Sequence, residues 1–316
     1  MLTEIVALYA AYPVLFATAA FVIGLVVGSF LNVVIYRLPI MMERDWHAQA
    51  ADVIASAASA AAVSNPTPAG AEAAVPPAER FTLAVPRSAC PACKAPIKAI
   101  HNVPVISWLM LRGRCAACKA PISPRYPAVE LATGILSAWV AWHFGFGAAA
   151  ACAIAVTWAL IALTGIDIDH QLLPDSITLP LVWAGLLAAV AFGPQPGAAL
   201  PVSPKDAIIG AAAGYLSLWM VFHAFRLATG KEGMGYGDFK LFAALGAWMG
   251  WKVLPVVILL AAATGAVLGI SMILLRGRDR AAPMPFGPYL AAAGWLAMLY
   301  GHDLVDGYLR VSGLRH

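Results

Sequence analysis

The sequence predicts an all-α polytopic membrane protein with about eight transmembrane helices and a small cysteine-rich module in a cytoplasmic loop. The first observation is composition: 61% of the 316 residues are hydrophobic and only 11% are charged, whereas about a quarter of the residues of a soluble domain are charged. The second is a series of apolar runs that approach the roughly 17 to 25 residues of a transmembrane helix. The third is that four of the five cysteines form two Cys-x2-Cys pairs in one long loop.

The apolar runs define the expected helices in chain order. The first run, from about residue 10 to 38, is too long for the hydrophobic region of a signal peptide and lacks a preceding basic segment, so we expect it to remain as a membrane helix. The sixth run, from about residue 239 to 250, is short, which leaves open whether the count is eight or seven. The expected helices are centred near Ile23, Ala138, Ala155, Trp183, Gly214, Ala244, Leu260 and Ala293.

The distribution of basic residues predicts the orientation in the membrane. The loop between the first two runs, residues 37–127, carries ten of the twenty Lys and Arg residues. Because cytoplasmic loops are enriched in these residues, we expect this loop to lie in the cytoplasm. Alternation of the helices then places both chain termini outside and brings residues 167–175 and 233–240 to the same cytoplasmic face.

The expected organisation has three segments. Residues 1–38 form the first transmembrane helix with an N-terminal motif, residues 39–127 form the cytoplasmic loop, and residues 128–316 form the transmembrane bundle. Within the loop, residues 48–78 are rich in Ala, Pro and Ser and carry few charges. We expect a flexible insertion there, with a short Ala-rich helix before Ser64 as the alternative.

The cysteine pairs lie in the second half of the loop, residues 86–126. Each pair is followed by the same Lys-Ala-Pro-Ile sequence, and the pairs are Cys90 with Cys93 and Cys115 with Cys118. Four thiolates suit a closed tetrahedral Zn²⁺ site, which is structural rather than catalytic, and predict a zinc-ribbon-like module stabilised by its metal. Disulfides are the alternative, which a reducing cytoplasm disfavours. Cys152, in an Ala-rich run, is expected to be a packing residue.

Three aspartates follow the third apolar run, where an ionised carboxylate is costly and calls for a reason. Asp175 follows Pro174 at the start of the next helix, and we expect it to cap that helix. Asp167 and Asp169 point about 200° apart on a helix, so only one of them faces the bundle. Asp167 lies deeper and is the better candidate for a buried functional group, with Asp169 as the second choice; His170 is expected at the membrane interface.

A fourth carboxylate, Asp238, lies in the stretch Gly-Met-Gly-Tyr-Gly-Asp-Phe-Lys of residues 233–240. Gly233, Gly235 and Gly237 permit positive φ and lack side-chain bulk, so we expect room for the backbone of a bound peptide. The alternative is a flexible turn with Asp238 capping the following helix. Asp167 and Asp238 together, at one face of one bundle, favour a carboxyl pair that shares a proton and supplies both acid and base, as in aspartic proteolysis.

The sequence resembles the type IV prepilin peptidases, also called leader peptidase/N-methyltransferases. The similarity runs in order over nearly the whole chain. Three of its segments are Ile-Asp-Ile-Asp-His-Gln-Leu-Leu-Pro-Asp (166–175), Gly-Tyr-Gly-Asp-Phe-Lys-Leu (235–241) and Pro-Phe-Gly-Pro-Tyr (285–289), and the others are residues 28–39, 86–93, 101–108, 114–118 and 123–127.

The resemblance implies a GxGD-type aspartic endopeptidase of the bacterial inner membrane. Such enzymes remove the leader from prepilins and pseudopilins at the cytoplasmic face and then methylate the new N-terminus with S-adenosylmethionine. The catalytic aspartates of the family fall on Asp167 and Asp238, and its zinc-ribbon cysteines fall on the four cysteines of the loop. Residues 48–78 are longer than the family requires.

Other functions stay open at this point. A glycine-rich dinucleotide-type motif after a strand is absent from the sequence, so the methyl-donor site is not assigned and a peptidase without methyltransferase activity is one alternative. A zinc-stabilised membrane transporter with a carboxylate relay is another, and a membrane-anchored binding module is a third. The net charge of +4 does not call for a nucleic-acid partner, and the sequence does not indicate the oligomeric state.

Overall fold

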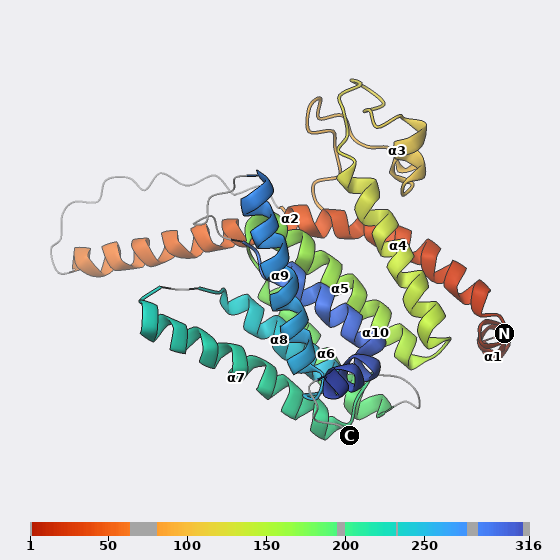
Figure 1. Ribbon diagram of the computed structural model, residues 1–316. Helices are drawn as coiled ribbons and strands as arrows, with labels where there is room; N and C mark the ends of the chain where they lie inside the picture. The colour runs from red at the N-terminus through yellow and green to blue at the C-terminus, as the bar shows by residue number, and fades with distance from the viewer. Residues whose placement is uncertain (1, 64–80, 195–199, 232, 277–283, 312–316) are drawn as a thin grey trace.

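The computed structural model describes residues 2–63, 81–194, 200–231, 233–276 and 284–311, and this part of the chain is helical with no strand (Figure 1). The short helices are α1 (Leu2–Ala11), η1 (Ala99–Asn102) and α3 (Ile106–Met110). The longer helices are α2 (Pro13–Val63), α4 (Arg125–Phe144), α5 (Ala148–His170), α6 (Asp175–Phe192), α7 (Pro204–Thr229), α8 (Tyr236–Met249), α9 (Leu254–Arg276) and α10 (Gly287–Val311). The all-α fold class is confirmed.

A helix covers each of the eight predicted centres. Five of these helices, α2, α5, α6, α7 and α9, are long and apolar enough to cross a membrane, so the protein is a multi-pass membrane protein. Helices α4, α8 and α10 are not among the five. Helix α8 has 14 residues and is about 21 Å long at 1.5 Å per residue, which is shorter than a hydrocarbon core of about 30 Å.

The short helix α8 is enclosed by its neighbours, because it packs against α6, α7, α9 and α10 (Figure 1). Its side chains are buried around the whole circumference, with Leu241, Ala244 and Ala247 fully inaccessible. A helix that is apolar on all sides is a buried helix. The sixth predicted segment is therefore an internal helix that carries Asp238 at its first turn.

Glycines bring the backbones of α7 and α8 into direct contact. A Cβ atom at Gly210 would overlap the carbonyl oxygen of Gly246, and one at Gly214 would lie 2.6 Å from the carbonyl oxygen of Phe242. Small residues four apart permit this close approach between membrane helices. The crossing fixes α8, and with it Asp238, against α7.

Helix α2 is longer than the sequence suggested. It continues through residues 48–63, so the expectation of a flexible segment is wrong there and the helical alternative is correct. Residues 48–63 are mainly alanine, the strongest helix former, and contain no Gly or Pro. Residues 64–78 lie outside the described residues. The C-terminal part of α2 extends beyond the bundle (Figure 1).

Candidate active site and four-cysteine module

Asp167 and Asp238 come from different helices and are both buried. Asp167 lies in the last turn of α5, which ends where Gln171 adopts a left-handed conformation and donates its N–H to the Asp167 carbonyl oxygen at 2.9 Å. Asp238 is the third residue of α8. The two residues are only 5% and 6% exposed, although aspartate is among the side chains least often found inside proteins.

The structure brings these two carboxyl groups together. The charge of Asp167 acts directly on Asp238. One oxygen of each group, Oδ2 of Asp167 and Oδ1 of Asp238, is buried and receives no hydrogen bond from the described residues. Buried carboxyl oxygens are normally hydrogen-bonded because leaving them unpaired is costly. The pair therefore has two buried acceptor atoms that a bound molecule could satisfy.

The wall of this site comes from the loop after α5 and from the start of α10. A Cβ atom at Gly287 would lie 2.6 Å from Oδ2 of Asp167 and 3.2 Å from Cδ1 of Leu173. A Cβ atom at Gly237 would lie 2.6 Å from Cβ of Leu173. Leu173 thus packs between the segments that carry the two aspartates, and its side chain is buried.

The three glycines before Asp238 have separate roles. Only Gly235 borders open space, since a Cβ atom there would meet nothing nearer than Oδ2 of Asp238 at 3.7 Å. A Cβ atom at Gly233 would lie 2.9 Å from the Phe225 ring, and Gly237 packs on Leu173. None of the three is among the glycines with positive φ in the described chain. The expectation that all three make room for a peptide is wrong for Gly233 and Gly237, because tertiary packing fills that space.

Asp169 is engaged elsewhere. The Nη1 atom of Arg125, at the start of α4, lies 2.7 Å from both carboxylate oxygens of Asp169. The Nη2 atom of the same arginine donates to the carbonyl oxygen of Gly165 at 3.2 Å. The guanidinium group therefore joins the start of α4 to the end of α5. His170, the last residue of α5, is exposed.

Asp175 does not cap α6 as the sequence suggested. It lies in the first turn, but the cap position is occupied by Pro174 and no side chain caps the helix. Both oxygens of Asp175 instead accept from Nζ of Lys240, at 2.6 and 2.7 Å. Lys240 is two residues beyond Asp238, so this ion pair joins the start of α6 to the first turns of α8. The carboxylate of Asp175 therefore pairs with the ammonium group of Lys240 from α8 rather than with the backbone N–H groups of its own helix.

The four-cysteine module, residues 86–126, contains two similar turns. Each turn is closed by an isolated β-bridge, Ala89 with Pro96 and Arg114 with Pro121. The N–H groups of Cys90 and Cys115 donate to carbonyl oxygens five residues on, at 3.0 and 2.8 Å. The sequence repeat is therefore also a structural repeat.

The thiols of the module form one cluster. The Sγ atoms of Cys90, Cys93, Cys115 and Cys118 all lie within 4.8 Å of one another, and Cys90 and Cys118 are 3.8 Å apart. A tetrahedral metal with sulfur ligands at about 2.3 Å places each sulfur pair about 3.8 Å apart. The cysteines are free rather than disulfide-bonded, so the cluster can hold a metal ion.

Backbone amides favour the ionised form of two of these thiols. The N–H groups of Cys93 and Ala92 lower the pKa of Cys90. The N–H groups of Cys118 and Ala117 lower the pKa of Cys115 to about 6. Thiolates are the metal-binding form of cysteine. Cys152 lies apart from the cluster, where it packs against the hydrophobic core.

Two buried charged residues that we did not single out from the sequence hold the module to the bundle. Arg37 of α2 donates to the carbonyl oxygens of Thr82 and Pro86, at 2.9 and 2.7 Å. Glu130 of α4 accepts the N–H of Val105 at 2.7 Å. Each is an isolated charge beside a long apolar run. Because such a charge is costly near a membrane, this position in the sequence indicates a buried residue with a specific partner.

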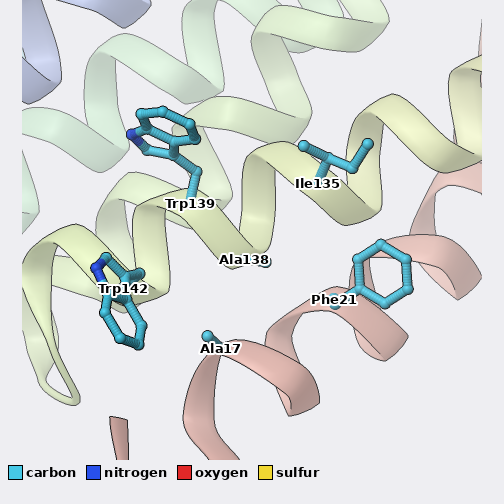
Figure 2. Close-up of a pocket in the computed structure, with 6 residues that line it drawn as sticks. All are labelled: Ala17, Phe21, Ile135, Ala138, Trp139 and Trp142. Atoms are coloured by element: carbon cyan, nitrogen blue, oxygen red, sulfur yellow. The ribbon is translucent and has the colours of Figure 1, made fainter. Parts of the chain in front are cut away.

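A cavity of about 500 Å³ lies elsewhere, between α2 and α4. Figure 2 shows its apolar lining, with Trp139 and Trp142 of α4 on one side and the side chains of α2 on the other. The residues drawn are Ala17, Phe21, Ile135, Ala138, Trp139 and Trp142. Its lining includes neither Asp167 nor Asp238 and offers no acid or base.

The chain matches known proteins over nearly its whole length. Residues 22–144 match the bacterial peptidase A24 N-terminal domain, and residues 154–270, which include both aspartates, match the type IV leader peptidase family. A prepilin leader peptidase/N-methyltransferase of Stutzerimonas stutzeri is 52% identical over 96% of this chain and 98% of its own. Proteins with the same name are 49% identical in Pseudomonas aeruginosa, over 97% and 98%, and 46% identical in Xanthomonas campestris, over 96% and 98%.

The relatives are therefore matched over nearly their full length. No solved structure matches the chain. The extent and identity of these matches place both halves of the chain, the four-cysteine module and the carboxyl pair within one family of membrane enzymes. The chain belongs to the type IV leader peptidase family.

Proposed function

We propose that this protein is a membrane aspartic endopeptidase that cleaves the leader from type IV prepilins and pseudopilins, with Asp167 and Asp238 as its catalytic residues. The observation that carries the proposal is the pair of buried carboxyl groups from α5 and α8, each with an oxygen that receives no hydrogen bond from the described protein. The names of the full-length relatives support the same activity.

The two carboxyl groups divide the chemistry between them. The ionised one accepts a proton from a water molecule, whose oxygen bonds to the scissile carbonyl carbon, while the protonated one donates its proton to the carbonyl oxygen. Breakdown of the resulting tetrahedral species breaks the C–N bond, and the amine leaves with a proton. No covalent acyl-enzyme forms, so no nucleophilic Ser or Cys is required.

The open side of Gly235 is where the substrate backbone approaches. A Cβ atom there would meet only the Asp238 carboxylate, at 3.7 Å, so a peptide can pass close to this carboxyl group. A prepilin carries a basic leader before an apolar membrane helix, so its scissile bond lies at the membrane surface. The proposed location is therefore the bacterial inner membrane, with the carboxyl pair and the residue 39–127 loop at the cytoplasmic face.

The proposed second activity is methylation of the new N-terminus with S-adenosylmethionine as the methyl donor. The names of the relatives, prepilin leader peptidase/N-methyltransferase, support it. We assign no residue to the donor site. A peptidase without methyl transfer is the remaining alternative, whereas a transporter is not supported by the family or by carboxylates at helix ends.

The proposed metal of the four-cysteine module is structural Zn²⁺. The four thiols fit its preferred ligands and tetrahedral spacing, and the module is too small to have a substantial core of its own. When bound, the metal fixes the two turns to each other. We propose three segments: residues 1–38, the module-bearing loop 39–127, and the peptidase bundle 128–316.

The test is a mass measurement on purified protein in detergent with a synthetic prepilin segment. We expect loss of the leader, and gain of a methyl group when S-adenosylmethionine is added. Asp167→Asn and Asp238→Asn should each abolish cleavage with the thermal unfolding unchanged. Asp303→Asn, at an exposed aspartate of α10, is the matched control. Full cleavage by either site variant would overturn the assignment of that residue.

A further inference from the structure

The start of α10 meets the carboxyl group of Asp167 at Gly287, the first residue of that helix. A Cβ atom on Gly287 would lie 2.6 Å from Oδ2 and 3.1 Å from Cγ of Asp167. Real Cβ atoms do not approach other atoms this closely, so the carboxyl group occupies space that any side chain at residue 287 would need. The same glycine carries the first backbone N–H of α10.

The local sequence singles out this N–H group. The carbonyl oxygen of Phe286 accepts the N–H groups of Tyr289 and Leu290, both at 3.1 Å. Pro288 has no N–H. Within the first turn of α10, the amide of Gly287 is the one for which no backbone acceptor is found among the described residues, and the positive end of the helix dipole favours a carboxylate nearby.

The contact also reaches Asp238. The position of a Cβ atom on Gly287 is 3.2 Å from Leu173, and Leu173 in turn packs on Gly237, the residue before Asp238. The start of α10, the loop after α5 and the start of α8 are therefore in continuous contact. We therefore expect a displacement at Gly287 to change the orientation of Asp167 relative to Asp238.

We propose that Gly287 is a positioning residue of the peptidase: its missing side chain admits the Asp167 carboxyl group and thereby sets the orientation of that group relative to Asp238. This inference rests on the proposed function for its kinetic consequences. Its geometric part, the contact between residue 287 and the carboxyl group, stands independently of the reaction.

The kinetic test compares three glycine-to-alanine variants of α10. In Gly287→Ala the added methyl group displaces the carboxyl group, and misplacement of a reacting group by about 1 Å costs about 100-fold in rate. We expect that loss in kcat, with little change in KM and an altered pH profile of kcat. A variant with the kcat and pH profile of the parent protein would refute the proposal.

Two matched controls separate positioning from packing. In Gly294→Ala the new Cβ atom would lie 2.6 Å from the methyl carbons of Leu245 rather than from a carboxylate. In Gly307→Ala it would meet no atom within 4 Å. We expect both to keep kcat within about threefold and to leave the pH profile unchanged, because the end of the Leu245 side chain can move aside, unlike a backbone carbonyl, and Gly307 borders open space. A loss in Gly294→Ala equal to that in Gly287→Ala would assign the effect to helix packing instead.

A stability measurement tests the contact without any substrate. If the clash is with the carboxyl group, Gly287→Ala should lower the unfolding temperature, or the folded yield, less in an Asp167→Ala background than in the parent. An equal loss in both backgrounds would overturn the proposed contact. If the parent protein cleaves no prepilin, the proposed function fails while this result still decides the geometry.

Discussion

Arg125 and Asp169 form an ion pair in which Nη1 lies 2.7 Å from each carboxylate oxygen. This pair separates the roles of two aspartates only two residues apart. Asp169 is compensated by a cation at the start of α4, whereas Asp167 is buried in the bundle. The side chain at the surface is paired, whereas the buried one has an oxygen that receives no hydrogen bond from the described residues.

The first prediction concerns this distinction. Asp169→Asn removes one partner of an exposed ion pair, which is worth about 1 kcal/mol or less, so we expect a small decrease in unfolding temperature and nearly full cleavage. Asp167→Asn removes an acid or base and should reduce the rate at least 100-fold, in keeping with the roughly 10²- to 10⁴-fold contribution of such groups. Cleavage rates of the two purified variants check this. Equal losses would return Asp169 to the catalytic pair.

The second prediction concerns the ion pair between Lys240 and Asp175. The pair is partly exposed, so Lys240→Gln should lower the free energy of unfolding by about 1 kcal/mol or less. This destabilisation should be smaller at high salt, where surface charges are screened. A double-mutant cycle with Asp175→Asn measures the coupling in thermal unfolding. Lys252→Gln, at an exposed lysine after α8, is the control. Additive single effects would mean that the contact does not stabilise the start of α8.

The third prediction concerns metal in the four-cysteine module. Purified protein should contain about one Zn²⁺ per chain, because the four thiols form one tetrahedral set. Cys90→Ser or a strong chelator should remove the metal and expose residues 81–124 to proteolysis, while Cys152→Ser should retain it. Elemental analysis with limited proteolysis checks both. Retention of the full metal content by Cys90→Ser would contradict the site.

The same module predicts a pH dependence of metal binding. The backbone N–H groups of Cys118 and Ala117 lower the pKa of Cys115 from 9.0 to about 6. A group with a lowered pKa in the folded state stabilises that state at high pH, and the stabilisation is lost as the pH falls through the lowered value. Protons then compete with the metal for the thiolate. Metal release measured with a colorimetric chelator should therefore rise as the pH falls below about 6, and pH-independent retention down to pH 4 would contradict this.

The fourth prediction concerns the contact between α7 and α8. Gly210→Ala would place a methyl group against the carbonyl of Gly246, and such overpacking costs about 1 to 3 kcal/mol. We expect a lower unfolding temperature and reduced cleavage, because α8 carries Asp238. Gly307→Ala, where the methyl group meets open space, should change neither. An unaffected Gly210→Ala would show that the two helices can separate without disturbing the site.

Much of the site was visible in the sequence for local reasons. Low charge and long apolar runs predict membrane helices whatever their arrangement, because the bilayer imposes the same length and polarity on each. The repeated Cys-x2-Cys turns predict a metal cluster because each turn brings its own two thiols together. The depth of Asp167 in its apolar run distinguished it from Asp169, since a helix separates residues two apart by about 200°.

The sequence by itself determined the membrane class, the four clustered cysteines that can hold a metal ion and the pair of buried carboxylates. Only the tertiary structure decided that α8 is an internal helix and that Asp175 pairs with Lys240 rather than capping a helix. It also showed that the space beside Gly237 is occupied by Leu173 and the space beside Gly287 by the Asp167 carboxyl group. The physical reason is that composition and periodicity act along the chain, whereas the neighbour of a missing side chain, or the partner of a charge, comes from another helix.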